Sequence, residues 1–267
     1  MNLLQALVFG LVQGLTEFLP VSSSAHVIIA GQIMGVSFPG LGFEIFLHLA
    51  SLLAVCLYFR KDLTEVVAGF SAYVLYRNPS CKTSFYFGLY ILTATFITAA
   101  AGLWLESILA GTMKSMMFIS AALCLTGFFL ILVERIRKCG QRMSQDMKFS
   151  DSVAVGLAQT LAVLPGISRS GATLICALWI GLSRETAVRY SFLLSIPIIA
   201  GSSGLMLLEA ARSPEFLPPA LPLASAFAAS FVFSWIGIVW LIDFLKKSRL
   251  VYFALYCFTA AFLIQLL

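Results

Sequence analysis

Residues 10–26 read GLVQGLTEFLPVSSSAH, and residues 156–173 read GLAQTLAVLPGISRSGAT. Each copy starts from the same Gly-Leu-x-Gln pattern and runs through a proline into a serine cluster. A polar hinge of this kind is costly inside an apolar segment, because its free backbone groups need partners there. Two such hinges at corresponding places in the two halves indicate a binding site at the interface of an internal repeat.

The composition predicts an integral membrane protein. The 267-residue chain is 60% hydrophobic and 11% charged, and its mean hydropathy is +0.98. A soluble domain carries about 25% charged residues. We interpret the net charge of +5 as a signal of membrane orientation, because no basic run on an aromatic surface accompanies it. The expected partner is therefore the lipid bilayer, with no nucleic acid.

Six segments are apolar over roughly the 20 residues that a membrane-spanning helix needs. They cover about 42–59, 84–107, 114–134, 185–211, 220–243 and 248–267. Two further apolar segments, about 3–36 and 151–183, are broken at the hinges into pieces too short for a comfortable crossing. We expect each of these two to form a re-entrant helix pair, which enters and leaves the membrane on the same side. The stretch 62–76 is expected to lie at the interface.

The positive charges support this arrangement. If both broken segments are re-entrant, fourteen of the seventeen Lys and Arg residues fall on one side. Lys114 and Arg212 fall on the other side, and Arg169 lies inside the second hinge. By the positive-inside rule the basic side is cytoplasmic, so both termini are expected outside. An alternative with eight or more full spans would scatter the basic loops over both faces.

The fold class predicted is all-α, with six transmembrane helices and two re-entrant helix pairs in an inverted-topology repeat. The repeats cover approximately 1–134 and 151–267, and a cytoplasmic linker, 135–150, joins them into a single polytopic membrane domain. Each half holds one re-entrant pair and three spans. Because three is odd, the second half is inverted, and the two re-entrant tips should meet near the midplane.

Two charged residues lie in or beside the hinges. Glu17 precedes the first hinge, with Gln13 one turn earlier on the same helix face, and Arg169 lies in the second hinge. A charge at membrane depth costs about 2.5–3.5 kcal/mol on insertion scales and is usually functional. One alternative is purely structural: a Glu17–Arg169 ion pair that locks the two tips together.

The surrounding hydroxyl groups predict an anion site. Ser22–Ser24 would open one half-helix, and Ser168–Ser170 would open the other, with Thr173 one turn later. Helix N-termini offer free N–H groups and a positive dipole end, which bind phosphate well. The alternative is simple N-capping, which explains one serine per hinge.

A histidine near a serine and a carboxylate can act as a general base or acid. His26 follows Ser23 by three residues, so the two share a helix face. The alternative is a histidine hydrogen-bonded to a neighbouring helix. His48 is a weaker candidate: it follows Glu44 by four residues in an apolar span, and a structural use is at least as well supported.

The two hinges are not equivalent. Glu17 aligns with Val163, and Ser23 aligns with Arg169. A phosphoryl-transfer site needs such a division between a nucleophile and a charge-stabilising group. A lipid-phosphate transporter or flippase with the same inverted repeat is the rival prediction from another class.

These residues carry a family resemblance over essentially the whole chain. The chain resembles the undecaprenyl-pyrophosphate phosphatase (undecaprenyl-diphosphatase, bacitracin-resistance) family of bacterial inner-membrane enzymes. The resemblance lies in the (Glu/Gln)-x-x-x-Glu motif at Gln13–Glu17 and its continuation to His26, in PGISRSGAT at 165–173, and in RYSFLLSIP at 189–197. The usual Thr-Gly-His after Val-Ser-Ser is Ser24-Ala25-His26 in this chain.

The resemblance implies removal of the terminal phosphate from a C55 polyprenyl diphosphate, which recycles the monophosphate carrier for cell-wall synthesis. It also implies a multi-pass protein of the bacterial inner membrane and a divalent cation, Mg²⁺ or Ca²⁺. Gln13 and Glu17 are the candidate metal ligands, although Gln13 in place of Glu weakens any scheme with two carboxylates. No sequence feature fixes the oligomeric state, so a homodimer stays open.

The predicted mechanism places the diphosphate between the hinges. Arg169 holds it together with the hydroxyl groups of Ser22, Ser168, Ser170 and Thr173. Ser23 attacks the terminal phosphorus or positions the attacking water, and His26 or Glu17 handles the proton.

Overall fold

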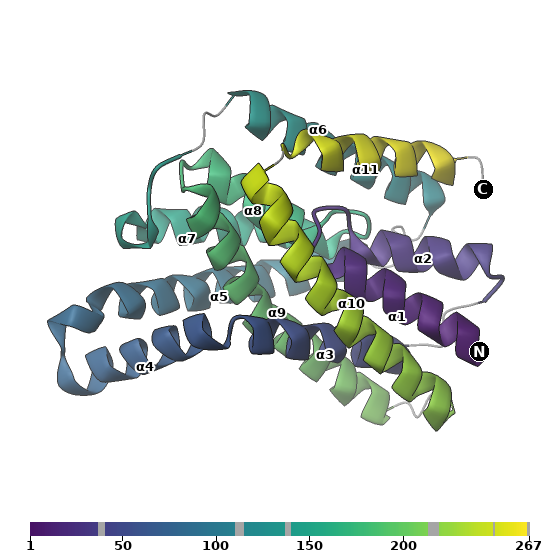
Figure 1. The fold of residues 1–267 in the computed structure, drawn as a ribbon, viewed down its shortest axis with the longest axis horizontal. Coiled ribbons are helices and arrows are strands. Elements are labelled where there is room, and N and C mark those ends of the chain that lie inside the picture. Colours follow the sequence, from purple (N-terminus) through teal and green to yellow (C-terminus); the bar gives the residue numbers. More distant parts are fainter. Residues whose placement is uncertain (37–40, 110–114, 137–139, 213–218, 248, 266–267) are drawn as a thin grey trace.

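The computed structural model describes residues 1–36, 41–109, 115–136, 140–212, 219–247 and 249–265, and within them the chain is all-helical (Figure 1). An isolated bridge between Arg142 and Leu182 is the one β-type pairing in these ranges. Three short 3₁₀ turns, η1–η3, lie at Pro79–Cys81, Ser144–Asp146 and Leu161–Val163. The α-helices are α1 (Leu3–Glu17), α2 (Ser23–Ile33), α3 (Leu41–Tyr58), α4 (Arg60–Tyr76), α5 (Lys82–Leu109), α6 (Met116–Ile136), α7 (Phe149–Thr160), α8 (Arg169–Trp179), α9 (Arg184–Arg212), α10 (Ala220–Lys247) and α11 (Val251–Ile264).

Both hinges break a helix where the sequence predicts. The first break separates α1 from α2, and Ser22 caps α2 with its hydroxyl accepting from the N–H of Ala25. The second break separates α7 and η3 from α8, and Ser168 caps α8 by accepting from the N–H of Gly171 at 3.0 Å. Proline in each hinge lacks an N–H, which explains why the helical ladder stops there.

Helices of one half pack on helices of the other. α1 packs along α10, and α7 packs along α5, while α3 lies against α9 and α6 against α11. Glycines permit the first two contacts: a Cβ on Gly10 would lie 2.3 Å from the carbonyl oxygen of Ala226, and one on Gly156 would lie 3.0 Å from Cα of Ala94. Repeat-equivalent glycines therefore serve the same close approach in both halves.

Four helical stretches of the described chain are long and apolar enough to cross a membrane: Pro79–Leu105, Met116–Arg135, Arg184–Leu208 and Ala220–Lys246. They match four of the six predicted spans. The predicted span at 42–59 corresponds to α3, which qualifies only together with α4, beyond a bend of 77°. The predicted span at 248–267 corresponds to α11, whose 14 residues extend about 21 Å at 1.5 Å per residue, less than a full crossing.

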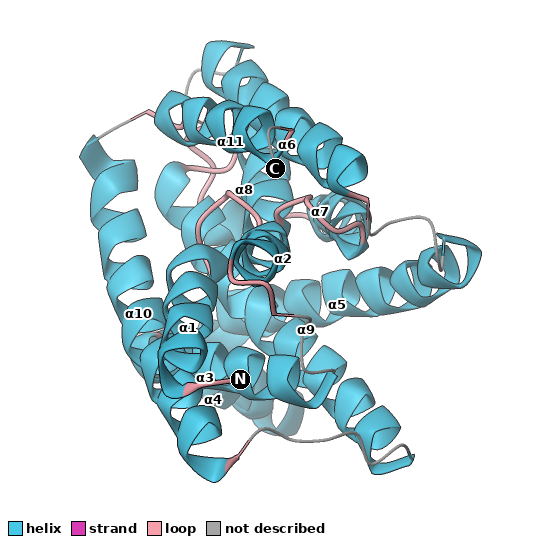
Figure 2. Cartoon of the chain, turned by 90° about the vertical axis from the view of Figure 1, so that its right-hand side faces the viewer, coloured by secondary structure: helices cyan, strands magenta, loops and turns pink. Residues whose placement is uncertain are grey.

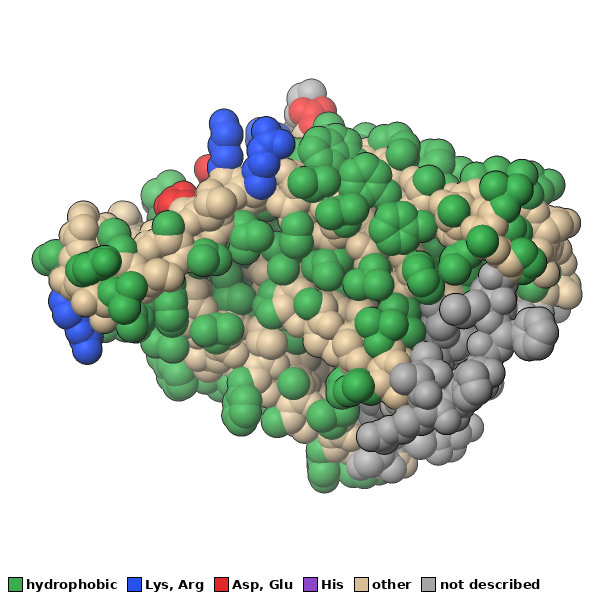
Figure 3. Space-filling model, turned by 90° about the horizontal axis from the view of Figure 1, so that it is seen from below, with side chains coloured by type: hydrophobic (Ala, Val, Ile, Leu, Met, Phe, Trp, Pro, Cys, Tyr) green, Lys and Arg blue, Asp and Glu red, His purple; other side chains and the backbone are tan. Residues whose placement is uncertain are grey.

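The figures show where the termini, the paired helices and the charged side chains lie. The start of α1 and the end of α11 lie at the same right-hand end of Figure 1, and the turn from α4 to α5 lies at the opposite end. Figure 2 shows α6 and α11 running side by side at one edge. In Figure 3 hydrophobic side chains spread over most of the face drawn, and Lys and Arg gather toward its left-hand part. Lys114, one of the two positive charges predicted on the outer side, lies outside the described residues.

Ion pairs join separate helices on the basic side of the predicted topology. Arg184 of α9 pairs with Glu134 of α6 at 2.9 Å. Arg142, in the described part of the linker, pairs with Asp151 of α7 and donates to the carbonyl of Ile180. The linker is therefore packed against the second half.

Candidate functional site

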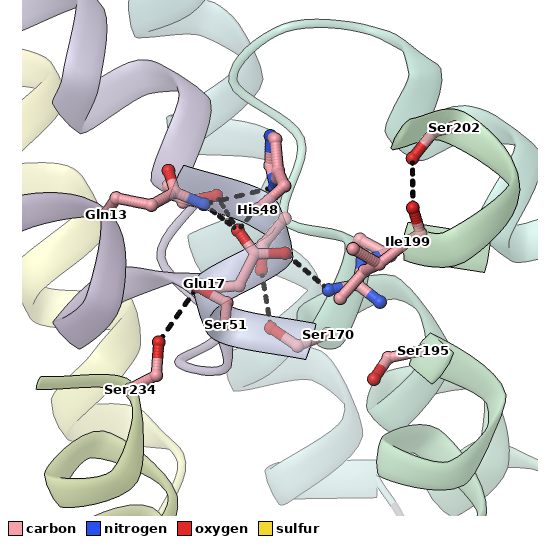
Figure 4. A network of polar contacts seen from close by, with 12 residues as sticks. Gln13, Glu17, His48, Ser51, Ser170, Ser195, Ile199, Ser202 and Ser234 are labelled. Carbon is pink, nitrogen blue, oxygen red and sulfur yellow. Dashed lines mark hydrogen bonds and ion pairs between the residues drawn. The ribbon is translucent and has the colours of Figure 1, made fainter. Parts of the chain in front are cut away.

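The carboxylate of Glu17 is the centre of the site. It is 6% exposed, at the end of α1, and accepts three hydrogen bonds. Nε2 of Gln13 and Oγ of Ser23 each donate to Oε2 at 2.7 Å, and Nη2 of Arg169 donates to Oε1 at 2.6 Å. Figure 4 shows Gln13 beside this carboxylate. Glu17, Ser23, Arg169 and Gln13, predicted separately from the two hinges, come together as predicted.

The ion pair of Glu17 with Arg169 joins the two halves of the chain. This pair is the structural alternative predicted from the sequence, and the structure contains it. Removing one partner would leave the other charge buried and uncompensated, which is strongly destabilising, so each of these two residues depends on the other. Yet the guanidinium has further N–H groups in a planar fork, which suits phosphate oxygens.

Two helix N-termini lie at this cluster. Ser23 is the first residue of α2, and Arg169 is the first residue of α8. Their positive dipole ends favour negative charge, and the free N–H groups of the first turn can bind phosphate oxygens. Ser22 takes a φ of +69°, which is rare for a residue with a side chain. Such conformations cluster at functional sites.

The serines of the second hinge hold the backbone of the first. Oγ of Ser170 donates to the carbonyl of Leu19 at 2.8 Å, and Oγ of Ser168 donates to the same carbonyl at 3.3 Å. Figure 4 shows Ser170 below Glu17. These two predicted phosphate ligands thus position the tips relative to each other. A bound anion would compete with the carbonyl of Leu19 for their protons.

Thr173 faces Ser191, which was not among the predicted site residues. Its hydroxyl forms a short contact with the hydroxyl of Ser191 on α9 and donates to the carbonyl of Arg169 at 3.1 Å. Both hydroxyls line a narrow cavity with Arg169 and Ser170, closed by apolar side chains such as Phe18. Ser191 lies in the RYSFLLSIP stretch, and that motif is the sequence signal that could have identified it as a site residue.

His48, the weaker candidate from the sequence, lies beside the carboxylate of Glu17. Its Nδ1 lies 3.2 Å from Nε2 of Gln13 and 3.7 Å from Oε2 of Glu17 (Figure 4). Its Nε2 lies 3.7 Å from Oε1 of Glu44 on the same helix. The spacing of four residues between Glu44 and His48 is the sequence signal for this contact, because it places both side chains on one face of α3.

His26 lies one turn beyond Ser23 but does not bond to it. Its Nδ1 lies 2.7 Å from the backbone carbonyl of Ser22, and its Nε2 lies 2.7 Å from the hydroxyl of Tyr256 on α11. The alternative of a histidine bonded to a neighbouring helix therefore describes this state. Glu17, and not His26, accepts the hydrogen bond of Ser23.

The geometry limits the kind of metal site that Gln13 and Glu17 can form. Gln13 turns an N–H toward Glu17, and both carboxylate oxygens already accept hydrogen bonds. Among the described residues no group of three or more His, Cys, Asp and Glu side chains is arranged to hold a metal ion. Mg²⁺ commonly takes one or two carboxylates together with substrate phosphates and waters. A cation of that kind would have to replace one of the donors to Glu17, and its other ligands would come with the substrate.

Proteins of one family match nearly the whole chain. A model of the family described as bacitracin resistance protein BacA matches residues 6–263. The chain belongs to this family. Undecaprenyl-diphosphatase 2 of Halalkalibacterium halodurans is 53% identical over 264 residues, which cover 98% of this chain and 94% of that protein. Undecaprenyl-diphosphatase 1 of Shouchella clausii is 49% identical over 265 residues, which cover 99% of this chain and 96% of that protein. Undecaprenyl-diphosphatase 3 of Bacillus anthracis is 36% identical over 255 residues, which cover 96% of this chain and 94% of that protein.

The BacA match covers every residue of the cluster around Glu17, from Gln13 to Ser191. It also covers α11 as far as Leu263, and therefore the contact between His26 and Tyr256. The resemblance stated from the sequence motifs is confirmed at the level of the family.

Proposed function

We propose that this chain is an undecaprenyl-diphosphate phosphatase, which converts undecaprenyl diphosphate to undecaprenyl phosphate and inorganic phosphate. Membership of the BacA family and the names of relatives that are 49–53% identical support the activity. The observation that carries the mechanism is the hydrogen bond from Ser23 to Glu17, next to Arg169 and between two helix N-termini.

The diphosphate binds between the two hinges in this proposal. Arg169 turns part of its guanidinium fork from Glu17 to the terminal phosphate, and the N–H groups that open α2 and α8 bind further oxygens. The hydroxyls of Ser22, Ser168, Ser170 and Thr173 add donors around it. Arg169 and the helix ends together counter the charge that accumulates on the transferred phosphoryl group.

The chemistry begins with Ser23. Its oxygen forms a bond to the terminal phosphorus, the bond from that phosphorus to the bridging oxygen breaks, and undecaprenyl phosphate leaves. Glu17 takes the proton of Ser23, since 2.7 Å is a suitable distance between nucleophile and base. Water then attacks the phosphoserine and releases phosphate, and the serine recovers its proton. If Ser23 instead orients a water, the same base serves and the reaction has one step.

His26 is the second group proposed to handle a proton, in the step that uses water. A divalent cation, Mg²⁺ or Ca²⁺, is proposed to arrive with the diphosphate and to be bound on the protein side by Glu17, with Gln13 beside it. When bound, the cation would neutralise phosphate charge, of which Arg169 can balance only part.

The finer topology is part of this proposal. Six spans and two re-entrant pairs form an inverted repeat, with halves at 1–134 and 151–267 and the linker 135–150 between them. The reciprocal packing of α1 on α10 and of α7 on α5 supports this arrangement, since it relates equivalent elements of opposite halves. The chain would lie in the bacterial inner membrane with both termini outside. Its substrate is lipid-borne, and a homodimer is compatible with the single-chain site.

This activity would return the lipid carrier to peptidoglycan synthesis. Bacitracin resistance, the property in the family's description, then follows from faster removal of the diphosphate lipid.

Phosphate release by the purified protein tests the proposal. We expect the wild type, in detergent with Mg²⁺, to release one phosphate per undecaprenyl diphosphate, and a chelator to suppress this release. Glu17→Gln keeps the size of the side chain and removes the base, so it should lower the rate at least about a hundredfold. In liposomes, movement of the lipid between leaflets without phosphate release would support the transporter and overturn the phosphatase.

A further inference from the structure

The imidazole of His26 is bonded through both of its nitrogens. Nδ1 lies 2.7 Å from the carbonyl oxygen of Ser22, and Nε2 lies 2.7 Å from the hydroxyl of Tyr256. The planes of the two rings are 11° apart, with 5.5 Å between centroids. Tyr256 comes from the last helix, α11, 230 residues along the chain. The contact therefore joins the first hinge to the second half of the molecule.

These contacts determine the tautomer of the neutral ring. A carbonyl oxygen only accepts hydrogen bonds, so Nδ1 must carry the proton that it shares with Ser22. Nε2 then has the free electron pair and accepts from the hydroxyl of Tyr256. Nε2 is thus the atom at which His26 can gain a proton, and Tyr256 is the residue that holds this atom.

A hydroxyl suits both protonation states of His26. When the ring is neutral, the hydroxyl of Tyr256 donates to Nε2. When the ring is protonated, the same oxygen accepts from Nε2–H, and the carbonyl of Ser22 still accepts from Nδ1–H. The ring can therefore gain and lose a proton without turning, because the hydroxyl can pass its own proton to Nε2 and take another from water, and the reverse. A phenylalanine in the place of Tyr256 would keep the ring contact and lose this property.

We propose that Tyr256 is a positioning residue of the phosphatase, whose hydroxyl holds Nε2 of His26 in place while the imidazole takes up and releases a proton. The inference rests on the proposed function, because it assigns His26 to the step that uses water. Ser23 bonds to Glu17 and not to His26, so Tyr256 serves this second step and leaves the attack by Ser23 to Glu17.

Tyr256→Phe tests the inference, with Tyr252→Phe as its matched control. Tyr252 lies one turn earlier on α11 and is also exposed, and its ring packs on Phe244. With undecaprenyl diphosphate as the probe, we expect Tyr256→Phe to lower kcat by roughly tenfold at an unchanged KM, a fraction of what a proton-transfer group contributes. Tyr252→Phe should match the wild type. A rise in KM with normal kcat would overturn the positioning role, because Tyr256 would then contact the substrate.

A double variant separates action through His26 from a general effect on structure. His26→Ala should lose more activity than Tyr256→Phe, and adding Tyr256→Phe to His26→Ala should lower kcat no further. A second full tenfold loss in the double variant would overturn the inference. If the wild type releases no phosphate at all, the proposed function fails instead, so the two failures are distinguishable.

A spectroscopic measurement tests the contact without activity. The chain has two histidines, so ¹⁵N-histidine labelling gives two imidazoles, and His26→Ala assigns them. In the wild type we expect the signals of an Nδ1–H tautomer for His26. In Tyr256→Phe the Nε2 resonance should move toward that of an imine nitrogen without a hydrogen bond. Identical His26 resonances in both proteins would overturn the proposal.

Discussion

Gln13 and Gln159 occupy equivalent places in the two repeated segments, 146 residues apart (159 − 13), but their amides bind different partners. Gln13 donates to the carboxylate of Glu17, whereas Gln159 donates to the hydroxyl of Thr98 on α5 at 2.9 Å. The reason lies one turn later in each copy, where the first has Glu17 and the second has Val163. The same residue thus serves the site in one half and helix packing in the other.

The serine clusters of the two hinges also differ in the partners of their hydroxyl groups. Ser23 of the first hinge bonds to a carboxylate, which can accept its proton. Ser168 and Ser170 of the second hinge bond to the backbone of Leu19 and so hold the first hinge in place. The comparison indicates that the first hinge reacts, and that the second supplies the cation and the support. Each prediction below tests one part of this division.

The largest effect should come from removing the cation of the second hinge. Arg169→Ala leaves Glu17 buried without its partner and the phosphate without its clamp, so we expect phosphate release to fall by at least about a thousandfold. Arg142→Ala, which breaks an ion pair in the linker, is the matched control and should keep its rate. Size-exclusion chromatography of both variants checks folding. Near-normal release by Arg169→Ala would mean that the second hinge has no charge-stabilising role.

Ser23→Ala should have the second largest effect on catalysis, because it removes the only hydroxyl that donates to Glu17 among the described residues. We expect a loss of at least about a hundredfold in kcat, together with the loss of any phosphoserine trapped with a slow substrate. Ser202→Ala is the control: its hydroxyl bonds to the carbonyl of Ile199 in its own helix. A phosphoserine found elsewhere would move the nucleophile out of the first hinge.

The paired glutamines offer a direct comparison. Gln13→Ala removes one donor from Glu17 and should lower kcat roughly ten- to a hundredfold, since a net hydrogen bond to a charged group contributes about 1.5–3 kcal/mol. Gln159→Ala should change kcat less than about twofold, because its amide contacts α5 and its Oε1 has no partner among the described residues. Equal losses of kcat in the two variants would contradict the division between hinges.

Substitution of the paired glycines, Gly10 and Gly156, should have the smallest effect on catalysis. The two substitutions should differ instead in how much they destabilise the protein. A Cβ at Gly10 would lie 2.3 Å from the oxygen of Ala226, and a Cβ at Gly156 would lie 3.0 Å from Cα of Ala94. We expect Gly10→Ala to destabilise the protein by about 1–3 kcal/mol and Gly156→Ala by less. Thermal unfolding in detergent measures both. A larger loss for Gly156→Ala would show that α5–α7 is the tighter contact.

Several features were predictable because they depend on local sequence. The apolar segments predicted the four helices that are long and apolar enough to cross a membrane, and the Pro and Ser clusters predicted both breaks. Glu17 and Arg169 were recognisable as candidate site residues, because a charge inside an apolar segment is usually functional. Hydrophobicity and hinge chemistry are properties of a few adjacent residues, so no tertiary information was needed.

Other features could not be predicted, since they depend on which helices pack together. The sequence placed His26 beside Ser23 by its spacing, but the ring is bonded to Tyr256 on α11. It left His48 as a weaker candidate and did not indicate that α3 places this ring against Gln13 and Glu17.

The sequence by itself therefore determined the membrane class, the two hinges and the residue types available for chemistry. Only the tertiary structure decided the partner of each group: Ser23 with Glu17, Ser170 with the backbone of Leu19, and His26 with a tyrosine 230 residues away. The physical reason is that a hydrogen bond needs atoms about 3 Å apart in a fixed direction. Helix spacing along one segment sets such distances within a turn, whereas the packing of distant helices sets the rest.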